Sequence, residues 1–401
     1  MFKERFKTHH SAMSDKMQYL VGEKTVLQVL SQPNKSTENN ATIYIHVPFC
    51  NKICTFCNMR RSLQTPTENY AQLIVKEIES YAQLEYIKTT VFDAVYFGGG
   101  TPTTLTGQQL AMIINALKTN FRFTDDAEFT IETTVTELDE EKMDTLVKAG
   151  ANRFSVGVQT FDDAGRKQMN RIGSGEKAYR CLEKLKSYEG VTVSMDLIYN
   201  YHGQTTESLY ADLDNIVKLG LDGFSMYSLI NMKNASIQSA QDEKTDEMLF
   251  NAIADRMKIH GYCFIELTKM VTKDKYKYIM NRHQGADTLP LGAGAGGSVN
   301  GLAMMNPISL AQYEESVKSF GERKGMLFGG EQKEIAIFKG DIQTGILPRN
   351  EKLYKDKQAY ITLRENLVAN GMAEFIDGEY RLTQKGIFWG NTISRELSQL
   401  I

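Results

Sequence analysis

The chain has 401 residues, of which 42% are hydrophobic and 24% are charged, with 46 basic and 49 acidic side chains. The formal net charge of -3 excludes the strongly basic surface of a protein that binds nucleic acid or an anionic membrane without specificity. No run of about 18 uninterrupted apolar residues occurs, so we expect no membrane span. Residues 1–7 are charged and lack the apolar core of a secretory signal, which predicts a cytoplasmic protein.

The first 40 residues are predicted to be an N-terminal arm. They end in a polar run, 33–40, that contains a proline and no apolar residue. From residue 41 to residue 265, short runs of β-branched and aromatic residues alternate with amphipathic helical patterns. The predicted strands are 43–47, 92–97, 128–132, 153–158, 191–199 and 223–227, and helices between them are 68–86, 107–118, 139–148, 176–187 and 207–219. Repeated strand–helix–strand units imply parallel pairing, so we predict an α/β fold with a curved sheet or partial barrel.

The strand and helix rhythm is lost after residue 265. We expect residues 266–330 to form a connecting segment that covers the substrate. Residues 331–401 carry two helical patterns, 352–369 and 387–397, around a hairpin-like piece whose Asp377-Gly378 pair favours a tight turn. This order predicts a C-terminal winged-helix-like domain, and the near-neutral charge of the chain argues against DNA binding by it.

Five cysteines are present, and three of them, Cys50, Cys54 and Cys57, fall within eight residues. An odd number of cysteines argues against a disulfide framework. The spacing C-x3-C-x2-C can hold three irons of a [4Fe–4S] cluster and leave the fourth iron open for a substrate or cofactor. A zinc site with His46 as fourth ligand and a set of unrelated buried thiols are the alternatives. Cys181 and Cys263 are expected to be buried thiols.

A second notable feature is the run Gly98-Gly99-Gly100-Thr101-Pro102, which follows the second predicted strand. Glycines there allow a ligand to approach the free N–H and C=O groups of the backbone, although a simple tight turn is the alternative. Since functional side chains lie at the C-terminal ends of parallel strands, the glycines and the cysteine loop are expected at one edge of the sheet.

These motifs resemble the radical S-adenosylmethionine (SAM) enzymes of the coproporphyrinogen dehydrogenase group. The resemblance covers residues 42–401. It rests on Tyr44-Ile45-His46-Val47-Pro48-Phe49-Cys50, the cysteine loop, the glycine run, Ser155-Val156-Gly157-Val158-Gln159, Asn170-Arg171 and Met195-Asp196-Leu197-Ile198-Tyr199. It implies a partial (β/α)6 barrel, a [4Fe–4S] cluster, and reductive cleavage of SAM to a 5′-deoxyadenosyl radical. The electron donor would be a protein such as flavodoxin or ferredoxin.

The resemblance also implies roles for individual residues. SAM would bind the open iron through its amino and carboxylate groups, and the backbone of Gly99, Gly100 and Thr101 would hold its methionine end. Tyr44 and Phe56 would flank the cluster and SAM. The polar contacts to SAM would be Glu132, Gln159, Arg171 and Asp196. Each polar residue has an ordinary structural alternative, such as an ion pair between Arg171 and Asp196.

Departures from the group's motifs bear on the substrate. Asn58-Met59-Arg60 stands where coproporphyrinogen dehydrogenase has a fourth cysteine, and 281–286 replaces the H-N-x-x-Y-W motif of the related heme chaperones. The run 289–297, rich in glycine, looks most like the anaerobic heme-degrading branch, and we expect it to form a surface suited to a flat macrocycle. It also matches G-x-G-x-x-G, but we reject a dinucleotide fingerprint because Pro290 spoils the preceding strand and Gly301 and Pro307 interrupt any following helix.

A heme substrate requires a ligand for its iron and partners for its propionates. The candidates are His9, His10, His202 and His283 for the iron, and Arg60 and Arg61 for the propionates by bidentate pairing. His46 is expected to be structural, and His260 to end a helix.

The leading hypothesis is an anaerobic radical SAM enzyme that opens heme with methyl transfer from SAM, which yields a linear tetrapyrrole and releases iron. The alternatives are a heme chaperone of the same group and an oxygen-independent coproporphyrinogen III dehydrogenase.

Overall fold

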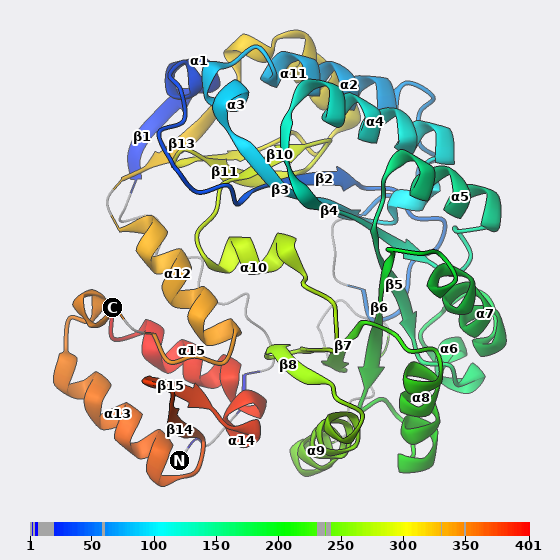
Figure 1. The fold of residues 1–401 in the computed structure, drawn as a ribbon, viewed down its shortest axis with the longest axis vertical. Helices are drawn as coiled ribbons and strands as arrows, with labels where there is room; N and C mark the ends of the chain where they lie inside the picture. The colour runs from blue at the N-terminus through cyan, green and yellow to red at the C-terminus, as the bar shows by residue number, and fades with distance from the viewer. Residues whose placement is uncertain are drawn as a thin grey trace.

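The computed structural model describes residues 2, 5, 6, 20–57, 61–230, 237, 242–329, 331–348 and 350–401. Figure 1 shows a curved sheet with most of its helices on the outside. The sheet has 13 strands in the order β1-β13-β12-β11-β10-β2-β3-β4-β5-β6-β7-β9-β8, and β1 and β8 lie at its two edges. The sheet is therefore open, as expected for a partial barrel.

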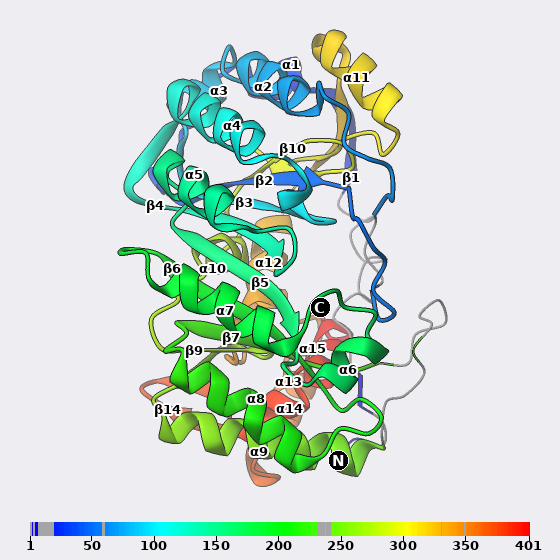
Figure 2. The ribbon, with the colours of Figure 1, turned by 90° about the vertical axis from the view of Figure 1, so that its right-hand side faces the viewer.

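The six predicted parallel strands are confirmed and lie side by side in chain order. They are β2 (Ala41–Val47), β3 (Val91–Gly99), β4 (Arg122–Thr134), β5 (Arg153–Gln159), β6 (Thr192–Tyr199) and β7 (Gly223–Ser228). Figure 2 shows the helices between them descending along the outer face. These helices are α2 (Tyr70–Tyr81), α3 (Glu85–Thr89), α4 (Gly107–Asn120), α5 (Glu140–Ala149), α6 (Asp163–Gln168), α7 (Gly175–Lys186) and α8 (Thr206–Lys218), with a 3-10 turn η2 (Pro102–Thr104) before α4.

Local sequence explains why these helices begin where they do. Thr106 and Thr205 each cap the following helix with a reciprocal capping box, and the Asp139 side chain accepts a hydrogen bond from the Lys142 N–H at the start of α5. Gly150, in the left-handed conformation at φ 108°, ends α5. The apolar faces of these helices pack on strands whose residues are buried on both faces, which accounts for the near-continuous apolar runs in the sequence.

Five further strands extend the sheet beyond β2, and sequence reasoning missed them. They are β10 (Thr288–Leu291), β11 (Gly296–Val299), β12 (Leu302–Met305), β13 (Lys324–Phe328) and β1 (Leu20–Thr25). The prediction that residues 1–40 are only an arm is therefore wrong for residues 20–30. There β1 pairs with β13, and α1 (Val26–Leu30) buries Val26 and Leu30 in the core. Helix α11 (Leu310–Lys318) and the turn η3 (Phe320–Glu322) complete this part.

Residues after β7 add two strands to the sheet and cover the N-terminal edge of the half-barrel. Strand β9 (Lys269–Val271) pairs antiparallel with β7, and β8 (Cys263–Glu266) pairs antiparallel with β9. Helix α10 (Lys277–His283) contacts β2 and β3. The Lys277 ammonium lies 2.9 Å from the Asp93 carboxylate at the start of β3, and Asn281 donates a hydrogen bond to the same carboxylate. Helix α10 therefore plugs the N-terminal edge of the half-barrel, the edge opposite to that predicted for the site (Figure 1).

The C-terminal region matches the predicted winged-helix-like order. It consists of α12 (Gln332–Gln343), η4 (Glu351–Leu353), α13 (Lys357–Ala369), the hairpin β14 (Ala373–Ile376) and β15 (Glu379–Leu382), α14 (Gln384–Phe388) and α15 (Gly390–Ser398). Asp377 and Gly378 both have positive φ, as their predicted turn requires. Arg5 ties the N-terminus to this region, because its guanidinium donates to the Phe388 carbonyl and pairs with Asp246 of α9 (Glu243–Ile259).

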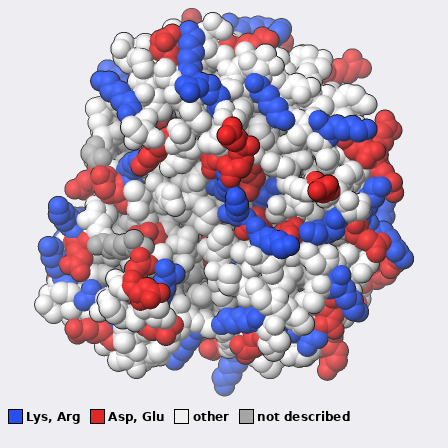
Figure 3. Space-filling model, in the orientation of Figure 1, with Lys and Arg blue, Asp and Glu red and all other residues white. Residues whose placement is uncertain are grey.

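The face drawn in Figure 3 carries intermixed basic and acidic side chains without one large patch of either sign. No helix within the described ranges is both long enough and apolar enough to cross a membrane.

Candidate active site

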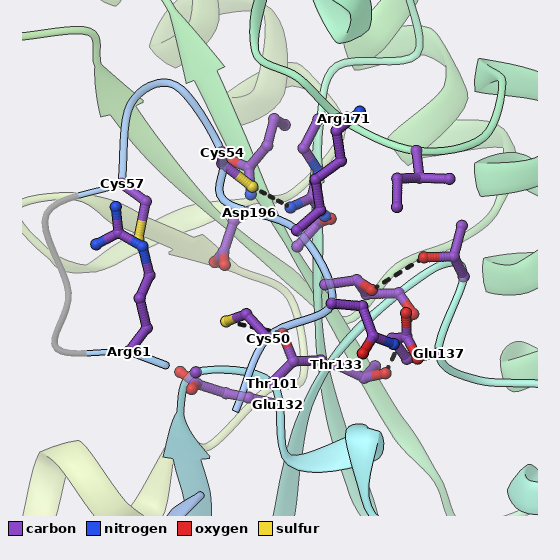
Figure 4. Close-up of a pocket in the computed structure, with 18 of the residues that line it drawn as sticks. Cys50, Cys54, Cys57, Arg61, Thr101, Glu132, Thr133, Glu137, Arg171 and Asp196 are labelled. Carbon is purple, nitrogen blue, oxygen red and sulfur yellow. Dashed lines mark hydrogen bonds between the residues drawn. The ribbon is translucent and has the colours of Figure 1, made fainter. Parts of the chain in front are cut away.

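One cavity of about 350 Å³ lies at the C-terminal edge of the parallel strands. Side chains from the ends of β3, β4, β5, β6 and β7 line it, together with the loop that follows β2 (Figure 4). The structure brings together most of the residues predicted for the site. These are Cys50, Cys54, Phe56, Cys57, Arg61, Gly99, Gly100, Thr101, Glu132, Gln159, Arg171 and Asp196.

Backbone hydrogen bonds hold the cysteine loop against two neighbouring segments. The N–H of Cys50 donates to the Ser62 carbonyl at 2.9 Å, and the N–H of Ser62 returns to the Pro48 carbonyl at 2.7 Å. In the middle of the loop, the Asn170 side chain donates to the Ile53 carbonyl at 2.7 Å. The loop is thus held at its start and in its middle, and all three thiols, each partly exposed, line the cavity.

The thiol groups have polar neighbours that belong to other strands. The Cys50 thiol lies 3.7 Å from the Thr101 hydroxyl, and one Arg171 N–H donates to the Cys54 sulfur at 3.1 Å. Burial raises the pKa of Cys50, while the Thr101 contact acts in the opposite direction. Binding of a metal, which requires the thiolate, would therefore have to displace a proton from Cys50.

The glycine run fits closely against the base of the cysteine loop. A Cβ on Gly99, which has φ 116°, would lie 2.6 Å from the His46 ring, and one on Gly100 would lie 2.5 Å from the Phe49 carbonyl oxygen. The N–H of Gly100 donates to Val47 and the N–H of Thr101 to Phe49. These N–H groups are therefore not free, which corrects that part of the sequence expectation. A ligand here would have to use carbonyl oxygens of this turn.

Two carboxylates, Glu132 and Asp196, face the cavity from β4 and β6. Burial raises the pKa of Glu132 to about 7; the Tyr96 hydroxyl, which donates to it at 2.5 Å, acts against this rise and the charge of Asp196 adds to it. Burial also raises the pKa of Asp196, against the effects of Lys269 and Ser225. Two neighbouring acids that are only partly exposed, in the wall of a cavity, favour a ligand that brings positive charge.

Arg171 and Gln159 complete the polar lining. Arg171 donates to the Cys54 sulfur and to the Gly157 carbonyl, so it binds these groups and forms no salt bridge with Asp196 in the part of the chain that the structure describes. Its Nε is buried without a hydrogen-bond partner. Gln159 adopts φ 76°, which is uncommon for a residue with a side chain, at an irregular step in the pairing of β5 with β6. Such strain is typical of functional sites.

The donor set fits an iron–sulfur cluster better than a single zinc ion. Within the described ranges, no three His, Cys, Asp or Glu side chains converge on a point that one metal ion could occupy. The His46 ring, the expected fourth zinc ligand, is buried with its Nδ1 2.9 Å from the Tyr44 hydroxyl. Three thiols around one cavity suit a cluster that spreads its ligands over separate irons. The two carboxylates suit SAM, which carries a positive sulfonium.

Several predicted residues lie elsewhere. His283 is not in the cavity: its Nε2 lies 2.6 Å from Glu266, at the plugged edge of the barrel. His202 is exposed on the loop after β6, and neither it nor Tyr44 is among the described residues that line the cavity. Tyr44 instead lies in a stack with Tyr96 and Tyr278. His9, His10 and Arg60 are outside the described residues.

The structure also places the two remaining cysteines, His260 and the proline before the glycine run. Cys181 is buried as expected, but Cys263 is exposed on β8. His260 does end α9. Pro290 does not disrupt β10, the strand before the glycine run. Strand β10 pairs with β2 along its length, whereas it pairs with β11 only through Thr288, so Pro290 takes no part in the pairing with β11. A strand, not a helix, follows the run, so the rejection of a dinucleotide site stands.

Two glycines of 289–297, Gly292 and Gly297, serve close packing of strands. A Cβ on Gly292 would lie 2.4 Å from the His46 carbonyl, and one on Gly297 would lie 2.2 Å from the Thr288 carbonyl. None of them is among the described residues that line the cavity. Packing against these carbonyls accounts for Gly292 and Gly297 without a ligand, and the expectation that this run forms a surface for a macrocycle stays a prediction.

Sequence reasoning missed several cavity residues, including Ser155, Tyr227, Thr134 and Glu137. Ser155 lies four residues before the predicted site residue Gln159 on the same strand, so period-two placement could have identified it. No site residue was predicted on β7, so the sequence offered no such signal for Tyr227.

Comparisons with known proteins agree with this site. The sequence model of the Radical SAM superfamily matches residues 44–216. The chain is 32% identical over 377 residues to anaerobilin synthase of Escherichia coli O157:H7, which covers 90% of this chain and 84% of that protein. It is 26% identical to the heme chaperone HemW of Lactococcus lactis, over 91% of this chain and 97% of the relative. It is 28% identical to the oxygen-independent coproporphyrinogen III oxidase of Escherichia coli K12, over 75% and 70% of the two chains.

The fold is similar to that of coproporphyrinogen III oxidase (HemN) from Escherichia coli, with a TM-score of 0.76 over 94% of this chain and 96% of that chain at 22% identity. The superfamily uses a [4Fe–4S] cluster and SAM, the two groups that the thiols and carboxylates of the cavity fit. The extent of the sequence match and the shared fold lead to one conclusion: the chain belongs to the radical SAM superfamily, in the group that contains anaerobilin synthase, HemW and the oxygen-independent coproporphyrinogen III oxidases.

Proposed function

We propose that this protein opens heme under anaerobic conditions, with methyl transfer from SAM, to give a linear tetrapyrrole and release iron. The observation that carries the proposal is the 32% identity to anaerobilin synthase over 90% of this chain. The sequence at 58–60, which lacks the fourth cysteine of coproporphyrinogen dehydrogenase, supports the same choice.

In this proposal Cys50, Cys54 and Cys57 hold three irons of the cluster, and SAM occupies the fourth. When bound, these two groups supply radical chemistry. Glu132 and Asp196 attract the cationic SAM, while Gln159 and Arg171 orient it and keep it beside the cluster. Phe56, which lines the cavity and packs against Met169, Ile198, Tyr201, Leu229 and Ile237, excludes water from one side.

The substrate would enter from the open side of the cavity. Arg61 lines the cavity and can pair with a propionate in bidentate geometry. His202 is exposed on the loop after β6, at the same edge of the sheet, and remains a candidate for the heme iron. An acidic protein such as flavodoxin or ferredoxin would supply the electron that the cluster requires.

A second candidate is heme delivery, because HemW matches 91% of this chain and 97% of its own length. A heme chaperone would bind heme at the same edge of the barrel without turnover. Decarboxylation of coproporphyrinogen III is the third candidate, supported by the HemN-like fold.

One experiment separates these functions. The cluster is reconstituted without oxygen, and SAM, a chemical reductant and heme are added while the heme absorbance and the products are followed by spectroscopy and mass spectrometry. Loss of heme with formation of a methylated linear tetrapyrrole supports ring opening. Stable heme binding without turnover contradicts it in favour of the chaperone, and activity on coproporphyrinogen III alone selects the third function.

A further inference from the structure

The carboxylate of Glu132 is held in place by a tyrosine that does not line the cavity. The Tyr96 hydroxyl donates to Glu132 Oε1 at 2.5 Å, and a Cβ on the neighbouring Gly98 would lie 2.7 Å from Oε2. The Tyr96 hydroxyl therefore engages one carboxylate oxygen, and the Gly99 N–H also donates to the carboxylate. The absence of a side chain at residue 98 leaves room for Oε2. Charge-assisted O–H···O bonds of this length are among the stronger hydrogen bonds in proteins.

Tyr96 is itself fixed by aromatic packing from the plugged edge of the barrel. It is 7% exposed and stacks on Tyr278 of α10, with ring centroids 4.6 Å apart and planes 23° apart. Tyr44 lies beside both rings, and the Arg282 guanidinium lies over the Tyr278 ring, 5.3 Å from its centroid. Rotation of the Tyr96 ring away from Glu132 would have to disrupt this stack.

We propose that Tyr96 is a positioning residue of the SAM site: its hydroxyl holds the Glu132 carboxylate in the orientation and charge state that bind SAM. This inference rests on the proposed role of Glu132 as a contact to SAM. Tyr96 acts through Glu132 and does not itself touch the ligand.

The hydrogen bond from Tyr96 to Glu132 affects how the affinity for SAM depends on pH. Besides Tyr96, the groups that face Glu132 are the Gly99 N–H from β3, the Asp196 carboxylate from β6, the Arg153 guanidinium from β5, and the hydroxyls of Tyr44, Tyr227 and Tyr278 from β2, β7 and α10. Burial raises the pKa of Glu132 to about 7, and the Tyr96 hydroxyl opposes this rise. The ionised form attracts the sulfonium of SAM, so SAM affinity increases as the pH rises through the pKa of Glu132. Removal of the hydroxyl raises that pKa further and moves the midpoint to higher pH.

The test measures equilibrium binding of SAM to the reconstituted, unreduced protein between pH 6 and pH 9. The variants are Tyr96→Phe, which removes only the hydroxyl, Tyr278→Phe as matched control, and Glu132→Gln. Tyr278→Phe removes a hydroxyl from the same stack that bonds Arg282 and not Glu132. Iron and sulfide content establishes that each variant carries the same cluster.

We expect Tyr96→Phe to weaken SAM binding about fivefold at pH 7 and to shift the midpoint upward by about one pH unit. Its affinity should return close to that of the wild type at pH 9, and Tyr278→Phe should follow the wild-type profile. An equal loss at every pH, or no loss, overturns the inference. If Glu132→Gln binds SAM as tightly as the wild type, the role of Glu132 fails and the inference with it; if Glu132→Gln weakens binding and Tyr96→Phe does not, only the inference fails.

Discussion

The C-terminal and N-terminal edges of the half-barrel differ in how completely their charged side chains are paired. At the C-terminal edge, Glu132 and Asp196 repel each other, burial raises the pKa values of both, and Arg171 Nε has no hydrogen-bond partner. At the N-terminal edge, Arg153 is fully buried and makes two hydrogen bonds of 2.8 Å to Asp274, and Lys269 lies 3.3 Å from the same carboxylate. The charged side chains at the C-terminal edge therefore lack some of their hydrogen-bond partners and counter-charges among the described residues, whereas the protein itself supplies those partners at the N-terminal edge.

The difference in charge pairing matches a ligand-binding role for one edge and a structural role for the other. A buried charged group without a partner lowers the stability of the fold. It therefore persists only where a ligand supplies the missing partner or where the rest of the fold is stable enough to offset the loss. Although burial opposes it, Arg153 and Lys269 hold the pKa of Asp274 well below its usual value. The N-terminal edge thus supports the barrel, and the C-terminal edge is prepared for a metal cluster and a cationic cofactor.

The largest effect is expected at the cysteine loop. Cys54→Ala removes one of three thiols around the cavity, so we expect loss of the iron–sulfur cluster and of all cluster-dependent turnover. Iron and sulfide analysis and the visible absorbance of the reconstituted protein measure this. Cys263→Ala, at an exposed thiol on β8, serves as the control and should retain a full cluster. A Cys54→Ala protein with an unchanged iron content would contradict the assignment of the loop.

At the opposite edge we expect a change in stability without a change in cofactor content. Asp274→Asn leaves Arg153 buried without its counter-charge, which should lower the free energy of unfolding by about 3–5 kcal/mol. Because the pKa of Asp274 is held low, the loss should be full from neutral pH down to the ordinary aspartate pKa, and it should shrink as the pH falls from there toward the lowered pKa of the folded protein. Urea unfolding measures it. Glu176→Gln, which breaks an exposed pair with Arg180, should have no measurable effect.

A smaller effect is expected where the glycine run meets the cysteine loop. Gly100→Ala places a methyl group 2.5 Å from the Phe49 carbonyl oxygen and should lower the free energy of unfolding by about 1–3 kcal/mol, together with the yield of cluster. Gly296→Ala is the control, because its methyl group would meet its nearest neighbour at 3.6 Å. Equal stability of the two variants would show that the close approach at Gly100 is not required.

The smallest effect tests the placement of His283. His283→Gln breaks the 2.6 Å contact with Glu266 and should lower the free energy of unfolding by about 1 kcal/mol. Since His283 lies at the plugged edge, the absorbance of bound heme should be the same in the variant and the wild type. His202→Ala provides the comparison, and a changed heme spectrum in His283→Gln would place the histidine in the substrate site after all.

Much of the parallel sheet could be predicted because its signals are local. Each strand before residue 229 is a short apolar run between amphipathic helices, and the crossover geometry of such units leaves few topologies. The missed strand β10 contains a proline, and β11 contains two glycines, both unfavourable for strands in isolation. They pair because β2 and β12 lie beside them, which is a non-local effect.

The sequence by itself determined the family, and it predicted the three cysteines as cluster ligands and the glycine run as part of the site, because metal ligation and backbone approach require particular residue types at short spacings. Only the tertiary structure decided which groups remained available at the site. It assigned the N–H groups of Gly100 and Thr101 to the cysteine loop and placed His283 at the plug. It also set Tyr96 behind Glu132. Hydrogen-bond partners, burial and pKa shifts arise between strands far apart in the chain, and no local spacing encodes them.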